Sequence, residues 1–164
     1  MRTSTVLILL SAGCSQMPSR EQTTVQPPAL TREQVRQASQ IVVESGSSAL
    51  WRSTSARWVF DANGKCFGEV THRFETQGAQ MAPSMTNYSL PPETFQEVQR
   101  LLSSSQFLSL TEGRQPGLFF ESSGSLAVIC NGRKHTISFG YVPQECRALW
   151  DFINNLPSRG KTSL

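Results

Sequence analysis

The sequence predicts an α+β domain: an antiparallel sheet of four to five strands, made of two β-hairpins, packed against two or three helices on one face. Two turn signals carry this prediction, because Ala62-Asn63-Gly64 and Asn131-Gly132 each stand between runs of alternating apolar and polar residues, which is typical of a hairpin. The third observation is that apolar residues before, between and after the hairpins recur at helical spacing. Helices and hairpins that alternate along a chain pack as two layers.

The first predicted helix covers residues 31–43. Thr31 can cap its first turn, and Gln34 stands three residues later, as in a capping box. Its last residues, Ile41-Val42-Val43, are β-branched and also favour the start of a strand, so both interpretations stay open. Residues 45–55 are rich in serine and glycine and predict a loop.

The two hairpins have predictable registers. The first pairs residues 56–61 with 65–75 and places Gly68 opposite Trp58, whose ring can cover the missing side chain. The second pairs 125–130 with 133–139 through a preferred type I′ turn. Its register joins three couples across the strands: Cys130 with Arg133, Val128 with His135, and Leu126 with Ile137.

The other predicted elements connect or follow the hairpins. Prolines at the starts of the two later helices suit a first turn, where no hydrogen bond is lost. In chain order these elements are a loop over 77–87, a helix over 93–102, a short candidate strand at 118–120, a helix beginning at Pro143, and a polar tail over 158–164.

The N-terminus has the pattern of a bacterial lipoprotein signal. Arg2 precedes a short apolar run, and Ser11-Ala12-Gly13 stand directly before Cys14. A charged start, a short apolar core and small residues before a cleavage site are typical of a secretory signal. The segment resembles the lipobox, whose cysteine becomes the lipidated first residue of the mature chain. We therefore expect residues 1–13 to be a signal peptide and Cys14 to be lipidated.

This interpretation divides the chain into four parts. After the signal peptide come the lipidated cysteine and a flexible, proline-containing tether over 14–29, a single α+β domain over 30–157, and the polar tail. The lipid on Cys14 would hold the protein on a membrane surface of the cell envelope, on the periplasmic side in a Gram-negative cell. Ser15 after the cysteine is compatible with the outer membrane of such a cell.

Composition argues against several function classes. The net charge is +3 and the chain has 15 Lys and Arg residues, scattered without a basic stripe, so no nucleic-acid partner is expected. Only two histidines are present and no cysteine spacing matches a metal site, so we expect no metal and no other cofactor.

Three cysteines follow Cys14. An exported compartment permits disulfides, and three thiols allow at most one bridge within the chain. Cys130 with Cys146 is the predicted pair, and Cys66 with Cys130 is the alternative. A third possibility is that all three are buried thiols that behave as small hydrophobic residues.

No catalytic residue is predicted, and the chain is not expected to be an enzyme. His135 is the best candidate by type, but alternation turns it toward the core beside Val128. His72 is expected to be solvated, and the sequence has no G-x-S-x-G motif. Trp51 and Arg52 lie in the predicted Ser-rich loop and are residue types that anchor partner proteins. We therefore predict a non-catalytic module that binds an envelope protein.

A family resemblance rests on four segments and one residue of the last helix: 41–43, 88–90, 107–110, 131–137 and Leu149. In this layout the chain resembles a group of bacterial lipoproteins with a hairpin–helix–hairpin–helix domain, whose activity is uncharacterised. It resembles more distantly the emfourin-type inhibitors of thermolysin-like metalloproteases. That resemblance implies an alternative function, a tethered protease inhibitor with its contacts in the loop after the first strand, here residues 44–51, which hold a single glycine.

Overall fold

The computed structural model describes residues 29–76, 79–114 and 122–163. The predicted signal peptide, Cys14 and nearly all of the predicted tether therefore lie outside the described residues. The candidate strand at 118–120 lies outside them as well.

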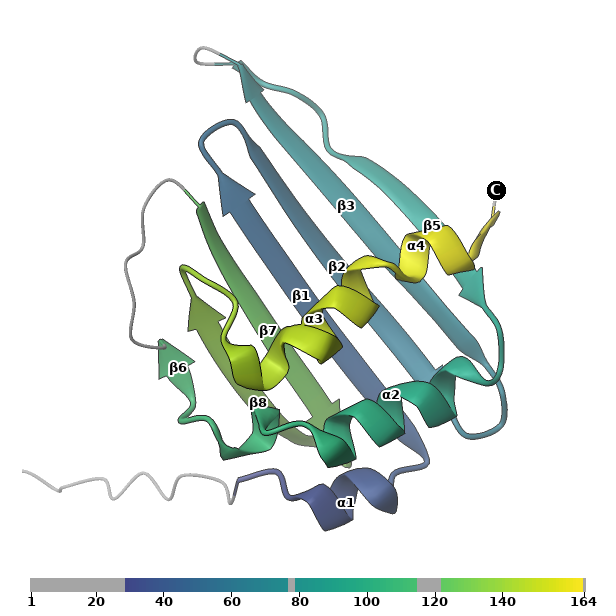
Figure 1. The fold of residues 1–164 in the computed structure, drawn as a ribbon. Coiled ribbons are helices and arrows are strands. Elements are labelled where there is room, and N and C mark those ends of the chain that lie inside the picture. Colours follow the sequence, from purple (N-terminus) through teal and green to yellow (C-terminus); the bar gives the residue numbers. More distant parts are fainter. Residues whose placement is uncertain (1–28, 77–78, 115–121, 164) are drawn as a thin grey trace, which may run out of the picture.

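The domain is a wide twisted sheet with all its described helices on one side (Figure 1). Seven strands pair antiparallel in the order β8-β7-β1-β2-β3-β5-β9, while β6 joins the β8 edge in parallel and β4 pairs with β3. The strands are β1 (Gln40–Ala49), β2 (Arg52–Asp61), β3 (Cys66–Thr76), β4 (Ala79–Gln80), β5 (Ser84–Leu90), β6 (Gly113–Arg114), β7 (Ser122–Cys130), β8 (Arg133–Phe139) and β9 (Lys161–Ser163).

Within the described residues, four short α-helices, and not the predicted two or three, lie over the sheet together with two 3₁₀ turns. The α3 helix crosses its middle, and α2 lies nearer the end of the sheet where the described chain begins. There α1 lies beside the middle and last turns of α2, and Gln99 donates to the Val35 and Arg36 carbonyls (Figure 1). The bounds are α1 (Arg32–Arg36), α2 (Thr94–Ser104), η1 (Phe107–Ser109), η2 (Gln144–Cys146), α3 (Arg147–Asn154) and α4 (Leu156–Arg159).

The predicted sheet of four to five strands is wrong, because the antiparallel sheet has seven. Three stretches predicted as loop or tail are strands: most of 45–55, which belongs to β1 and β2, part of 77–87, and 161–163. Serine and glycine disfavour strands in isolation, but neighbouring strands override that preference. β1 lies between β2 and β7 and pairs with both along nearly its whole length.

The N-terminal helix is shorter than predicted. Its capping box is confirmed, since the Gln34 amide donates to Thr31 Oγ1 at 3.3 Å and the Thr31 amide donates to Gln34 Oε1 at 3.0 Å. The helix ends at Arg36, and Ile41-Val42-Val43 lie in β1. Of the two interpretations of this run, the strand is the one observed.

Both predicted hairpin registers are confirmed. Trp58 pairs with Gly68, and a Cβ atom built on Gly68 would lie only 1.9 Å from Trp58 Cε3. The second hairpin pairs Val128 with His135, as its turn predicts. Asn131 and Gly132 have φ values of 50° and 74°, the left-handed conformation that a type I′ turn requires.

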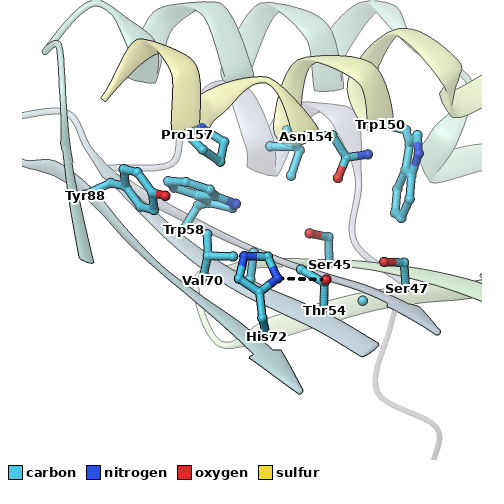
Figure 2. Close-up of a pocket in the computed structure, with 13 residues that line it drawn as sticks. Ser45, Ser47, Thr54, Trp58, Val70, His72, Tyr88, Trp150, Asn154 and Pro157 are labelled. Carbon is cyan, nitrogen blue, oxygen red and sulfur yellow. Dashed lines mark hydrogen bonds between the residues drawn. The ribbon is translucent and has the colours of Figure 1, made fainter. Parts of the chain in front are cut away.

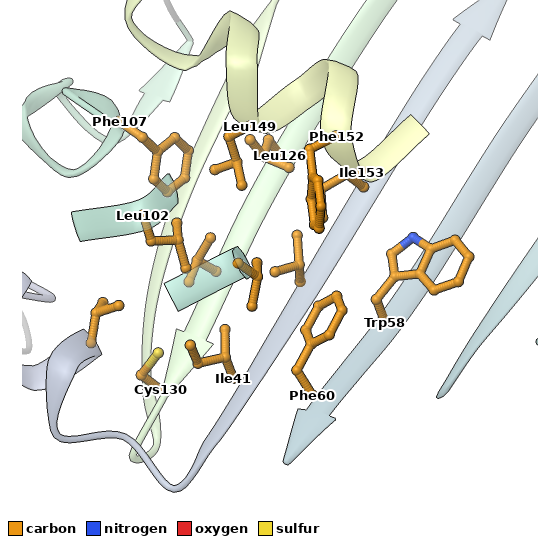
Figure 3. Packing of buried hydrophobic residues seen from close by; sticks show 14 of the residues in the cluster. Ile41, Trp58, Phe60, Leu102, Phe107, Leu126, Cys130, Leu149, Phe152 and Ile153 are labelled. Carbon is orange, nitrogen blue, oxygen red and sulfur yellow. The ribbon is translucent and has the colours of Figure 1, made fainter. Parts of the chain in front are cut away.

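The hydrophobic core lies between the helices and one half of the sheet (Figure 3). Ile41 and Phe60 of β1 and β2 are fully buried against apolar side chains of the helices. Farther along the same two strands, the inward-facing positions hold small polar residues, among them Ser45 and Thr54. The covered face of the sheet therefore changes from a packed core to a polar surface.

Candidate functional site

A cavity of about 240 Å³ lies where the covered face of the sheet becomes polar. Its floor comes from β1, β2, β3 and β5, and its roof comes from α3 and α4 (Figure 2). The cavity exists because two small residues, Ser45 and Ala56, face each other on β1 and β2. Larger side chains at these positions would extend to the helices and fill it. A second cavity of about 440 Å³ adjoins it toward the β1–β2 turn and shares Thr54 and Trp150 with it.

Aromatic rings close the cavity at two opposite sides (Figure 2). On one side, Trp58 and Tyr88 pack with ring centroids 5.8 Å apart. On the other side, Trp150 packs edge-to-face on Phe139 at 5.1 Å. These ring contacts hold the aromatic side chains on both sides of the cavity in place.

The polar side chains of the floor contact one another. His72 Nδ1 lies 3.0 Å from Thr54 Oγ1 and 3.4 Å from an Arg52 guanidinium nitrogen. Because a guanidinium can only donate, Nδ1 accepts and the ring proton lies on Nε2. The His72 ring points up from β3 into the cavity (Figure 2), so it offers Nε2–H there as a donor.

The indole nitrogen of Trp58 is the unusual group of the cavity. Trp58 is 1% exposed, and its Nε1 has no hydrogen-bond partner within the part of the chain that the structure describes. In Figure 2 the nitrogen is on the side of the ring that faces the cavity rather than Tyr88. Buried indole N–H groups usually have a partner, so this donor indicates a place for an acceptor.

Trp51 and Arg52, the predicted partner-binding residues, lie at the tip of the β1–β2 hairpin rather than in a long loop. The turn consists of Leu50 and Trp51, which are 56% and 62% exposed. Arg52 pairs with Phe74 across β2 and β3, and its guanidinium carbon lies 5.5 Å from the centre of that ring.

Apolar side chains from a second hairpin join this tip. Phe74, at the end of β3, is exposed, and its carbonyl accepts from the amide of Met81, whose side chain is also exposed. The Trp51 carbonyl accepts from the Glu75 amide at 3.0 Å and so ties the two hairpins together. We call Leu50, Trp51, Arg52, Phe74 and Met81 the tip surface.

His135 is a packed histidine, as its alternation predicts. It is 2% exposed, and its Nε2–H donates to the Phe107 carbonyl at 3.1 Å. Glu112 Oε1 lies 3.3 Å from Nδ1, outside hydrogen-bond geometry. The ring also packs edge-to-face on Phe107. These contacts hold β8 to η1, and the histidine faces neither the cavity nor the tip surface.

Cys66, Cys130 and Cys146 are all free and buried in the structure, so the predicted Cys130–Cys146 bridge is not formed. Cys130 lies at the turn end of the β7–β8 hairpin, whereas Cys146 follows the opposite end of β8. Burial raises the pKa of both thiols to about 11, and it raises the pKa of Cys66 as well. The thiols are therefore protonated and unreactive at neutral pH.

The alternation of the sequence could have indicated the cavity. Ser45, Ser47, Thr54 and His72 continue the inward-facing positions of β1, β2 and β3, and polar residues at core positions are a recognisable irregularity. The sequence predicts a solvated His72, and this prediction is wrong, because the ring is half-buried in the floor. Phe74 and Met81 of the tip surface have no local signal, because the sheet register alone brings them beside Trp51.

No three His, Cys, Asp or Glu side chains among the described residues stand together as a metal-binding group would. Within the same ranges, every helix is too short or too polar to cross a membrane. Comparison of the chain with protein-family models gives no match, and comparison with curated proteins gives none either.

Proposed function

We propose that this protein is a lipid-anchored lipoprotein of the bacterial cell envelope whose domain binds a partner protein through the tip surface. The observation that carries the proposal is the set of exposed apolar side chains at the ends of two adjacent hairpins. Tryptophan, other aromatic residues and arginine are the residue types that dominate protein–protein binding energy.

The tip surface lies far from the point where the predicted tether joins the domain. The predicted tether joins the domain next to α1, at one end of the sheet, and the tip surface lies at the other end (Figure 1). Between them β1 is ten residues long, which corresponds to about 30 Å. The tip surface is therefore separate from the point where the tether joins the domain and is free to meet a partner protein.

Arg52 gives the surface a polar element beside its apolar ones. Its guanidinium is held by the Phe74 ring and by His72 Nδ1, so little side-chain entropy remains to be lost on binding. A partner with an apolar pocket for Trp51 and a carboxylate or carbonyl for Arg52 would match this arrangement.

Photocrosslinking in the native envelope tests the proposal. A photoreactive phenylalanine analogue replaces Trp51, and the matched control places the same analogue at Phe67, which is 53% exposed on the other face of the sheet. We expect a discrete crosslinked species from position 51 that is lost when Arg52→Ala is added. The same species from both positions, or none from position 51, would contradict the assignment.

The anchor is tested separately by palmitate labelling of the full chain in bacteria. Wild-type protein should incorporate the label and fractionate with membranes, because two or more acyl chains anchor a protein stably. The Cys14→Ser variant should do neither. A labelled Cys14→Ser variant would overturn the lipidation site and leave the proposed tip surface untouched.

Protease inhibition stays a prediction from the distant resemblance. The residues that the resemblance would place in a protease-contact loop, 44–51, lie in β1 and its turn. Assay of the full chain against a thermolysin-type protease would test this activity, and no inhibition at micromolar concentration would remove it.

A further inference from the structure

We infer that the cavity beneath α3 and α4 is a binding site for one ring of a neutral saccharide. This goes beyond the proposed partner binding, since it concerns a different site and a different class of ligand. The inference rests on three independent observations: a cavity with two aromatic walls, a floor of uncharged donors and acceptors, and a buried indole N–H without a partner.

The charge of the lining selects the ligand class. The cavity is lined by hydroxyl, amide, imidazole and indole groups and contains no Asp, Glu, Lys or Arg. The adjoining cavity adds a single charged residue, Arg52. Phosphorylated or strongly anionic ligands are recognised by several cations, so this lining suits an uncharged ligand.

The mixture of aromatic and hydroxyl groups narrows the class further. A pyranose ring presents apolar C–H faces and a rim of hydroxyls, and here aromatic side chains stand on two sides of a polar floor (Figure 2). His72 Nε2–H can donate to a sugar oxygen, and a small shift of the lining opens the sealed Trp58 Nε1–H to another. The Ser45 hydroxyl and the Asn154 amide can donate or accept. A purely apolar ligand would leave the Trp58 donor unsatisfied, which is unfavourable in a buried site.

The size of the cavity sets the length of the ligand. At about 240 Å³ it is smaller than sites for drug-sized ligands, which span roughly 300–1,000 Å³, so it holds about one ring. The adjoining cavity of about 440 Å³ gives a second ring or a substituent a place to extend toward Arg52.

NMR tests the inference. The measurement follows the indole N–H signals in a ¹H–¹⁵N spectrum of the full chain in detergent. The chain has three tryptophans, two in the cavity walls and Trp51 at the exposed tip as an internal control. We expect glucose or N-acetylglucosamine at millimolar concentration to shift the Trp58 and Trp150 signals saturably while Trp51 stays unchanged. Cyclohexanol, a ring with one hydroxyl, should not saturate the site.

Matched variants show which groups bind. Thr54→Val removes a floor hydroxyl and its contact with His72, and Thr71→Val is the control on the outer face of the neighbouring strand. We expect Thr54→Val to weaken sugar binding about tenfold and Thr71→Val to bind as wild type. Asn154→Ala, with Asn155→Ala as control, repeats the comparison on α3, where Asn154 is exposed and folding is not at risk.

Three results would overturn the inference. They are the absence of any saturable shift with both sugars, an equal response to cyclohexanol, and wild-type affinity in both Thr54→Val and Asn154→Ala. None of these results depends on the tip surface, so they leave the proposed partner binding to its own test.

Discussion

The two halves of the β1–β2 hairpin differ although they belong to the same pair of strands. Near α1, Ile41 pairs with Phe60 and both side chains are fully buried. Near the turn, Ser47 pairs with Thr54 and Ala49 with Arg52, and these residues line the cavities instead of packing in the core. We call residues 40–44 with 57–61 the packed half, and 45–49 with 52–56 the open half.

The difference shows that one hairpin can contribute to the stability of the fold through one half and line a candidate binding site with the other. Hydrogen bonds between the strands are continuous, so the open half is positioned by the packed half without a core of its own. Binding sites need accessible polar groups and cavities, which contribute little to stability. Because the cavities lie beyond the core, one part of each strand provides stability and the other part provides accessible polar groups.

The largest expected effect comes from opening the packed half. Phe60→Ala removes a fully buried ring and should lower the free energy of unfolding by about 3–5 kcal/mol. Thr54→Ala in the open half loses the contact with His72 and should cost about 1 kcal/mol. Urea denaturation of both variants measures the difference. Equal losses would mean that the two halves do not differ in stability.

Gly68→Ala should be the next most damaging change. The added Cβ atom would lie 1.9 Å from Trp58 Cε3, so the ring must move, at an expected cost of about 1–3 kcal/mol. In a Trp58→Leu background the same substitution should cost less, since the clashing ring is gone. Thermal unfolding of the wild type, the two single variants and the double variant gives the coupling free energy between positions 58 and 68. Additive effects would exclude the Trp58 ring as the cause.

The buried thiols provide a pH-dependent test. In the folded protein, burial raises the pKa of Cys130 and of Cys146 to about 11, whereas the unfolded thiols ionise near 9.0. The unfolded state therefore loses protons first, and the free energy of unfolding should fall as the pH rises from about 9 to about 11. A Cys130→Ala, Cys146→Ala variant should show less of this fall, while an equally steep fall would assign it to other groups.

Alkylation compares the hydrophobic core with the open half at neutral pH. Peptide mapping after iodoacetamide treatment should find Cys66, Cys130 and Cys146 unmodified in the folded chain, because all three are buried. A thiol introduced in the open half by Ser47→Cys, at an exposed position, should be modified readily. Modification of all four at similar rates would show that the core opens as often as the open half.

The smallest effect is expected on the outer face, where Glu44 joins β1 to β2 and, across β7, to β8. Its carboxylate oxygens lie 2.9 Å from Lys134 Nζ and 2.7 Å from an Arg57 guanidinium nitrogen. The hydrogen bond from Lys134, helped by both positive charges, lowers the pKa of Glu44. Glu44→Gln should cost about 0.2–1 kcal/mol, while Glu33→Gln, in an exposed pair at 3.9 Å, should cost nothing measurable.

The Glu44 contribution also has a defined pH dependence. Because the folded-state pKa is lowered, the contribution is present above the unfolded value and is lost as the pH falls through the folded one. The difference between wild type and Glu44→Gln should therefore vanish in acid and persist at neutral pH. A difference that is unchanged in acid would argue that the ion pairs are not its source.

The parts of the fold that depend on local chemistry could be predicted from the sequence. Asn131-Gly132 favours one turn type, and that turn sets the register of β7 and β8. Alternation placed Gly68 opposite Trp58 and turned His135 inward for the same reason. These features need only neighbouring residues, so a single sequence contains them.

The missed strands depend on distant partners. Ser45 to Ala49 form a strand because β2 and β7 flank them, and Lys161 and Thr162 form one because β5 offers a free edge. The same limit applies to the sites. Trp51 and Arg52 could be singled out by residue type, but Phe74 joins them only through the pairing of β2 with β3.

Native-state hydrogen exchange along β1 tests the division of the hairpin most directly. Backbone amides of 41–44 should exchange only on global unfolding, with one common free energy, while those of 47–49 should exchange through local opening at a clearly lower free energy. Uniform protection along the ten residues of β1 would contradict the account, because the open half would then be as stable as the packed half.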